Sequence, residues 1–214
     1  MRDAYTDQLD SIRDDLLTMT RLVGESVAQA TKALLEGDGQ LAERVISEDD
    51  VIDNLRVRLE DRSFELLSLQ NPVAGDLRML VASLRMVGEL ERMGDLSVHI
   101  AKVARLRVPE VAVPTELVPT ISRMAAVAEV MVAKVGHIIA DSDVAAAREL
   151  EQVDEEMDRL RRASFRELLG AEWKHGVEPA IDIALLGRYY ERIADHAVSI
   201  ARRVVFLVTG EQPG

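Results

Sequence analysis

Apolar side chains recur every three or four residues along most of the chain, which is the spacing of one face of an α-helix. No stretch alternates apolar and polar residues for long enough to indicate a β-strand, so we expect no sheet. The pattern predicts six long helices, near residues 5–36, 39–70, 73–107, 115–140, 143–172 and 178–208.

Short segments of helix-breaking residues separate the predicted helices. Proline disfavours the helical conformation of the residue before it, glycine is a poor helix former, and Asp or Ser caps a new helix. These segments are Gly37-Asp38-Gly39, Asn71-Pro72, the linker between Pro109 and Pro114, Asp141-Ser142-Asp143, and His175-Gly176 with Pro179 just beyond. Because the connections are short, consecutive helices should pack antiparallel.

The chain contains an internal repeat. Residues 90–101 read LERMGDLSVHIA and residues 190–201 read YERIADHAVSIA, with Glu, Arg, Asp, Val, Ile and Ala recurring at matching places. An earlier pair, Asp49 and Asp53, recurs as Asp154 and Asp158. We therefore predict an all-α fold of two tandem antiparallel three-helix bundles with a pseudo-twofold internal repeat, covering residues 1–109 and 110–214.

Four pairs of acidic residues share a spacing of four, which places both members on one face of a helix. The pairs are Asp49/Asp53, Glu91/Asp95, Asp154/Asp158 and Glu191/Asp195. Asp53 precedes Pro72 by the same 19 residues by which Glu91 follows it, and 23 residues separate Pro72 from Asp49 and from Asp95. At about 1.5 Å of rise per residue, both pairs lie roughly 28–35 Å from the turn, so an antiparallel hairpin brings them to one level. The second half repeats this arrangement around the turn at His175-Gly176.

The acidic pairs continue apolar stripes, so we expect them to face inward. Glu91 and Asp95 follow Leu77, Val81, Leu84 and Gly88 in steps of three or four. Inward carboxylates repel one another and lose hydration, which a bound cation would offset. The pattern favours a metal site of Fe, Mn, Mg or Ca, with Zn as a further choice, on these eight residues.

A second interpretation is that the acids form ordinary ion pairs on a solvated face. The arginines placed for this are Arg56, Arg92, Arg161 and Arg192. The four histidines are expected to pack or to cap helices rather than bind metal, because a lone helical histidine has no ligand set around it. They are His99, His137, His175 and His196.

Charge and motif content exclude several functions. The formal net charge is −12, so the chain lacks the basic footprint of a nucleic-acid-binding protein. It has no cysteine, no signal-peptide pattern and no apolar run of the ~20 residues that cross a bilayer, which favours the cytoplasm. Nucleotide-binding loops, zinc-protease motifs and nucleophile elbows are absent, so we expect no enzyme activity.

Residues 71–104, NPVAGDLRMLVASLRMVGELERMGDLSVHIAKVA, and residues 182–211, DIALLGRYYERIADHAVSIARRVVFLVTGE, resemble the two signatures of the PhoU family. The resemblance covers essentially the whole chain. It departs from the family at Ala194, where the second E-R-I-G-D motif usually has glycine. It implies two three-helix bundles whose E/D-x-x-x-D motifs bind metal, here through the eight acidic residues named above.

The resemblance also implies a function. PhoU-like proteins restrain phosphate uptake and the phosphate-starvation response, as cytoplasmic adaptors between a phosphate ABC transporter and a sensor histidine kinase, and they often dimerise. The sequence leaves a second possibility open, in which a carboxylate-rich bundle stores metal or performs redox chemistry.

Overall fold

The computed structural model describes residues 2–70, 72 and 74–210, and it confirms the all-helical fold. The elements are α1 (Arg2–Glu36), α2 (Gly39–Gln70), α3 (Ala74–Arg107), a 3₁₀ turn η1 (Thr115–Leu117), α4 (Val118–Asp141), α5 (Val144–Leu168) and α6 (Val177–Thr209). These described residues contain no strand. The predicted break at Asn71, the predicted helix start at residue 73 and the last residue of the second PhoU-like signature lie outside them.

The breaker segments end and start helices as predicted. Gly37 has a φ of 66°, a left-handed conformation that glycine adopts without strain, and it follows the last residue of α1. The Asp38 carboxylate then accepts hydrogen bonds from the backbone N–H groups of Gln40 and Leu41, at 3.0 and 2.9 Å. Asp143 caps α5 in the same way, accepting from Ala146 at 3.0 Å. Capping satisfies backbone donors that have no partner within the helix.

Three predicted helix boundaries are wrong by three or four residues. The first helix begins at Arg2 rather than near residue 5. The fifth helix ends at Leu168 rather than near residue 172, because its last turn tightens: the Gly170 N–H bonds the Glu167 carbonyl, three residues back. The predicted helix at 115 begins as the separate turn η1, and α4 follows only at Val118, with a proline in its first turn.

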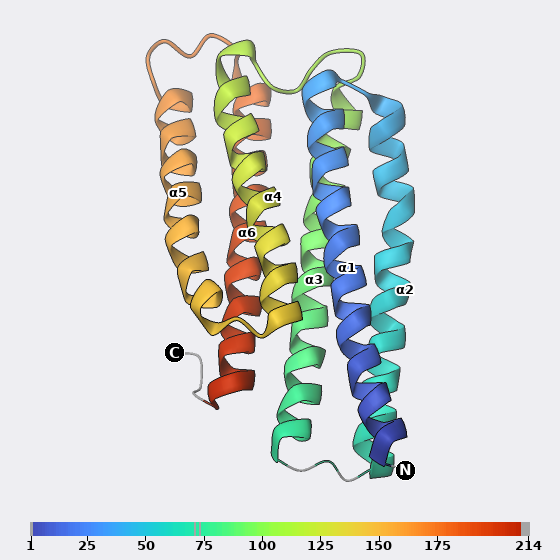
Figure 1. Cartoon of the computed structure of the whole chain (residues 1–214). Coiled ribbons are helices and arrows are strands. Elements are labelled where there is room, and N and C mark those ends of the chain that lie inside the picture. The colour runs from blue at the N-terminus through green and yellow to red at the C-terminus, as the bar shows by residue number, and fades with distance from the viewer. Residues whose placement is uncertain (1, 71, 73, 211–214) are drawn as a thin grey trace.

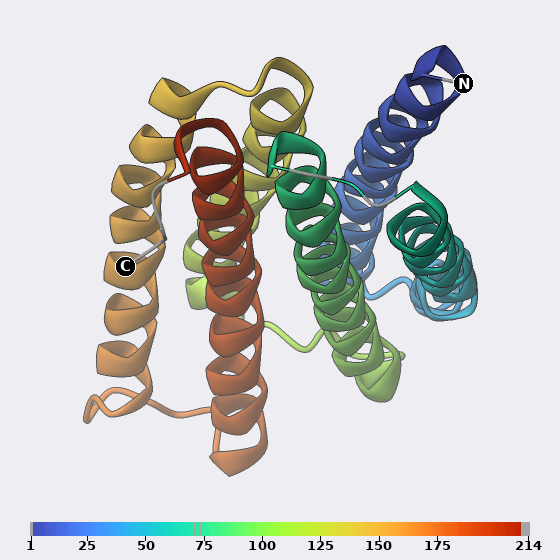
Figure 2. The ribbon, with the colours of Figure 1, turned by 90° about the horizontal axis from the view of Figure 1, so that it is seen from below.

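Helices α3 and α6 lie side by side at the centre of the molecule, and α2 and α5 form its two outer edges (Figures 1 and 2). Within each half the three helices pack against one another, and α1 also packs against α4. No helix in the described ranges is both long and apolar enough to span a membrane.

The two halves share one hydrophobic core, drawn from all six helices. Polar contacts also join the halves: the buried hydroxyls of Thr31 and Tyr190 are 2.8 Å apart, and Arg107 Nε lies 2.6 Å from Asp182 Oδ2. Each repeat therefore completes its core against the other. The boundary between residues 109 and 110 stays a prediction.

The contact between α3 and α6, called the α3–α6 seam below, follows the internal repeat. On one side of the α3–α6 seam, Ser199 donates to Glu89 at 2.6 Å, and on the other His99 stacks on Tyr189 with ring centroids 5.3 Å apart. These are equivalent pairs, because residues 100 apart occupy matching places in the two repeats. The seam is therefore antiparallel and pseudo-twofold.

Candidate functional site

The first site lies between α2 and α3, where the structure brings together the four acids of the first repeat. Burial, followed by the nearby charges of Asp53, Asp95 and Glu91, raises the pKa of Asp49 to about 6. Burial and the charge of Asp95 also raise the pKa of Glu91. Mutual electrostatic influence of this kind requires proximity, so the two pairs lie at one level, as the equal distances from Pro72 indicate.

The second site, between α5 and α6, repeats this arrangement. Burial, followed by the charges of Asp195, Asp158 and Glu191, raises the pKa of Asp154 to about 6, and Arg202 partly opposes this rise. Asp154 is the repeat counterpart of Asp49. The two halves therefore place one half-buried aspartate among three other carboxylates.

The acids do not all face inward, contrary to the expectation from the apolar stripes. Glu191 is buried, with 8% of its surface exposed, whereas Asp195 one turn further along α6 is exposed. The other six acids are half-buried. Both sites therefore lie near the surface, between neighbouring helices, rather than in the core.

Arginines enter the first site. Arg56 Nε lies 4.0 Å from Glu91 Oε1, and Arg92 Nη1 lies 3.0 Å from Asp95 Oδ2. Arg56 also pairs with Glu60 at 3.1 Å. The ion-pair interpretation thus holds for two of the arginines that the sequence indicates here.

Arginines neutralise the second site more fully. Glu191 pairs with Arg161 at 3.3 Å and also with Arg188, one turn earlier on α6. Arg162 lies 3.8 Å from Asp158. Sequence reasoning missed Arg188, whose counterpart in the first repeat is Gly88; the signal was an arginine three residues before Glu191.

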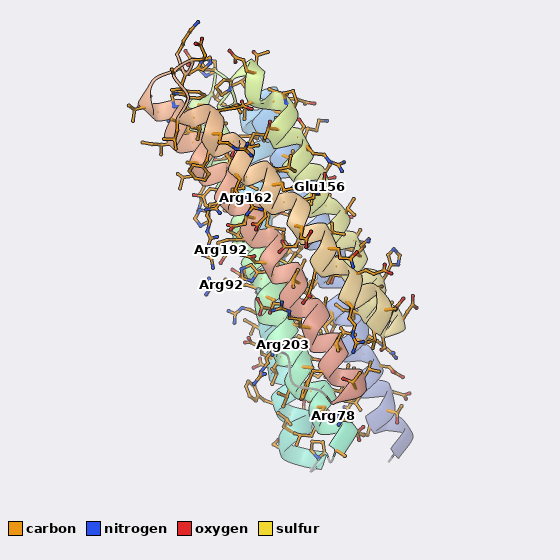
Figure 3. All side chains as sticks on the ribbon, turned by 90° about the vertical axis from the view of Figure 1, so that its left-hand side faces the viewer. Arg78, Arg92, Glu156, Arg162, Arg192 and Arg203 are labelled. Atoms are coloured by element: carbon orange, nitrogen blue, oxygen red, sulfur yellow. The ribbon has the colours of Figure 1, made fainter. Side chains whose placement is uncertain are left out.

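Arg192 was expected to pair with an acid, but it forms no ion pair with any residue that the structure describes. Figure 3 shows Arg192 and its repeat counterpart Arg92 projecting from the side of the molecule formed by α3 and α6. The charge of Arg192 is therefore open to solvent or to a partner.

The donor chemistry of both clusters suits a hard cation, because carboxylate oxygens are the ligands such ions prefer. Gly94 also leaves room beside the first cluster, since a Cβ there would lie 3.3 Å from Asp49 Oδ1. As the side chains stand, however, the described part of the chain holds no group of three or more His, Cys, Asp or Glu residues arranged around a metal position. A cation would have to displace arginines from Glu91 or Glu191. Metal binding by the eight acids stays a prediction.

Sequence reasoning also missed a polar cluster at the α3–α6 seam. Glu89 lies 2.6 Å from His196 Nδ1 and accepts the Ser199 hydroxyl hydrogen bond. The hydrogen bond from His196 chiefly lowers the pKa of Glu89. His196 and Ser199 match the positions of Leu96 and His99 in the first repeat, so the repeat alone does not indicate this cluster.

Comparison with known proteins places these features in a family. The PhoU domain model matches residues 16–104 and again residues 121–204. A Mycobacterium tuberculosis protein named phosphate-specific transport system accessory protein PhoU homolog 2 is 44% identical over 213 residues, which cover 100% of both chains. The crystal structure of PhoU from Pseudomonas aeruginosa superposes with a TM-score of 0.90, at 30% identity, covering 97% of this chain and 100% of that one. The phosphate transport system regulatory protein PhoU from Streptococcus pneumoniae gives a TM-score of 0.89 at 27% identity, over 98% and 99% of the two chains.

Proposed function

Since the chain belongs to the PhoU family, we propose that it is an accessory and regulatory protein of a phosphate transport system. In this role it acts in the cytoplasm as an adaptor between a phosphate ABC transporter and a sensor histidine kinase. It holds the kinase inactive when phosphate is plentiful, and so represses the phosphate-starvation response and phosphate uptake. The single observation that carries the proposal is the full-length match to proteins named as accessory to phosphate-specific transport.

The charged surface of the chain supports an adaptor. Many exposed ion pairs leave charged side chains free to exchange partners, since such pairs contribute little to stability. Specific and reversible docking through complementary charge suits such a surface.

We further propose that the two acidic clusters bind a divalent or trivalent cation, such as Fe, Zn, Mn or Mg. Bound metal would supply positive charge that fixes α2 to α3 and α5 to α6. Asp49 and Asp154 would lose their protons to it more readily, because a nearby cation stabilises a carboxylate. The first cluster is the more favourable one, since Arg56 and Arg92 lie 4.0 and 3.6 Å from Glu91, whereas the two arginines of the second cluster lie closer to Glu191.

A metal-storage or redox bundle is the competing function. The gathering of four acids in each half favours it, but the arginines in both clusters do not. A storage site gains capacity from uncompensated carboxylates, and Arg56, Arg92, Arg161 and Arg188 compensate them here.

A reporter assay tests the regulatory role. Cells that lack the gene and any related copy should express a phosphate-responsive promoter at high phosphate, because the kinase is no longer restrained. Restoring the wild-type gene should return the promoter to its low activity. Unchanged repression without the gene would contradict the regulator, and a loss of cellular iron or manganese content in the same cells would favour storage.

A further inference from the structure

An apolar groove lies at the α5–α6 end of the second bundle, away from both acidic clusters. Its volume is about 610 Å³, and its lining includes Phe165, Leu169, Trp173, Val177 and Ile181. Three of these side chains are largely open to solvent: Leu169 is 84% exposed, Val177 75% and Ile181 52%. Large apolar side chains grouped on a surface in this way commonly mark an interaction site.

The exposed apolar side chains form a ridge that fits a helix. Val177, Ile181 and Leu185 follow one another at intervals of four on α6, with Leu185 41% exposed. Leu169 and Phe165 border the groove from the C-terminal end of α5. Two antiparallel helices with an apolar groove between them accept a third helix, whose own apolar residues recur at intervals of three and four.

The charge around the groove is basic, although the chain as a whole is acidic. Residues 159–176 carry five Lys or Arg side chains against two Asp or Glu, in a chain with 26 basic and 38 acidic residues. Lys174 lines the groove itself, and Arg166 is exposed beside it. Arg162, which lies 3.8 Å from Asp158, and Arg192, which has no ion pair among the described residues, continue the basic surface from that end toward the middle of the molecule (Figure 3).

The acidic groups nearest the groove on α6 share a single arginine. Arg107 lies 3.2 Å from Glu178 and 2.6 Å from Asp182. Glu167 and Glu172 remain as exposed acids on the α5 side, where the basic residues outnumber them. An occupant of the groove would therefore meet basic side chains on the α5 side, Arg166 and Lys174 among them.

We propose that this groove is the docking site for an amphipathic helix of a partner protein, with one apolar face flanked by acidic side chains. The inference rests on the adaptor role proposed above and names the surface by which the chain would contact its partner. The apolar face of the helix would cover Val177, Ile181 and Leu169, and its acidic flank would face Lys174 and Arg166.

Site-specific cross-linking in cells tests the proposal. The full-length chain is produced with the photo-reactive residue p-benzoylphenylalanine in place of Ile181. A matched control carries it in place of Leu77, which is exposed in the first bundle and is the repeat counterpart of Val177. We expect residue 181, but not residue 77, to cross-link to an acidic amphipathic helix of another protein. A synthetic peptide of that helix should bind the full-length wild-type chain.

Binding of the same peptide to variants gives the second measurement. Ile181→Asp and Lys174→Glu should each weaken binding by at least about tenfold, since hot-spot residues carry most of the binding energy, and Leu77→Asp should leave it unchanged. Each of these positions is exposed, so circular dichroism should show that all three variants keep the wild-type helix content.

Four results would overturn the docking surface. In the cross-linking experiment they are no cross-link at residue 181 above that at residue 77, or a cross-link to a second copy of this chain. In the binding experiments they are vesicle binding by the wild type that Ile181→Asp removes, or peptide binding that the variants do not weaken. The adaptor function fails separately. If the cross-linked helix belongs to neither a phosphate transporter nor a histidine kinase, the surface stands and the proposed function falls.

Discussion

Replacing Asp49 with Asn should stabilise the metal-free protein at neutral and alkaline pH. In the folded chain Asp49 is half-buried among Asp53, Glu91 and Asp95, and its pKa rises from 3.8 to about 6. Above pH 6 the carboxylate is ionised in both the folded and the unfolded state, but only the folded state carries the cost of burial and repulsion. Asn is close in shape and has no charge, so the substitution removes that cost.

The pKa shift of Asp49 sets the size of the expected stabilisation. A shift of about two units corresponds to about 3 kcal/mol at 1.36 kcal/mol per unit. Because Asp49 is partly exposed, solvent screening reduces this value, and we expect a gain of about 1–1.5 kcal/mol. For a chain of this size that is an increase in Tm of roughly 2–6 °C.

The stabilisation by Asp49→Asn should depend on pH. A raised folded-state pKa means that the destabilisation is absent below pH 3.8, where Asp49 is protonated in both states, and grows until pH passes about 6. The gain from Asp49→Asn should therefore be present at pH 8 and vanish near pH 4.

Thermal or urea unfolding with a chelator present measures this gain at both pH values. Asp154→Asn should behave in the same way, since its pKa is raised to about 6 by the same causes. Asp61→Asn, at an exposed position on the same helix whose charge is not among those that raise the pKa of Asp49, is the control and should change stability little. A loss of stability at pH 8, or a gain independent of pH, would refute the account of the acidic cluster.

Three further substitutions test the fold and the second site. Arg188→Gln should cost about 1–2 kcal/mol in chemical unfolding, because buried Glu191 then keeps only Arg161 at 3.3 Å; no loss would show that Arg161 alone suffices. Thr31→Val should lower the unfolding free energy by about 1–2 kcal/mol, since it leaves the fully buried Tyr190 hydroxyl without its partner, and a change near zero would contradict that bond. Asp143→Ala should cost about 1 kcal/mol, measured as a fall in Tm, because α5 loses its N-terminal cap. An unchanged Tm would show that the cap contributes little to stability.

The helices and their order could be read from the sequence because their signals are local. Apolar spacing, the left-handed Gly37 and the cap at Asp143 act within a few residues, so tertiary context changed little. The boundary at Leu168 was missed because a tightened final turn at Gly170 is not visible in the periodicity of apolar residues. The common level of the acidic pairs also followed from sequence, since a helical hairpin converts equal distances from a turn into equal heights.

The tertiary structure decided which acids are buried and which distant charges meet. The sequence placed Glu191 and Asp195 on one apolar stripe, yet Glu191 is buried and Asp195 exposed, because burial at a helix groove depends on how the neighbouring helix crosses it. Glu89 meets His196 across 107 positions of sequence, and Arg107 meets Asp182 across 75. Such contacts arise from the packing of α3 on α6, which buries side chains of both repeats in one core, and the sequence of neither repeat alone specifies that packing.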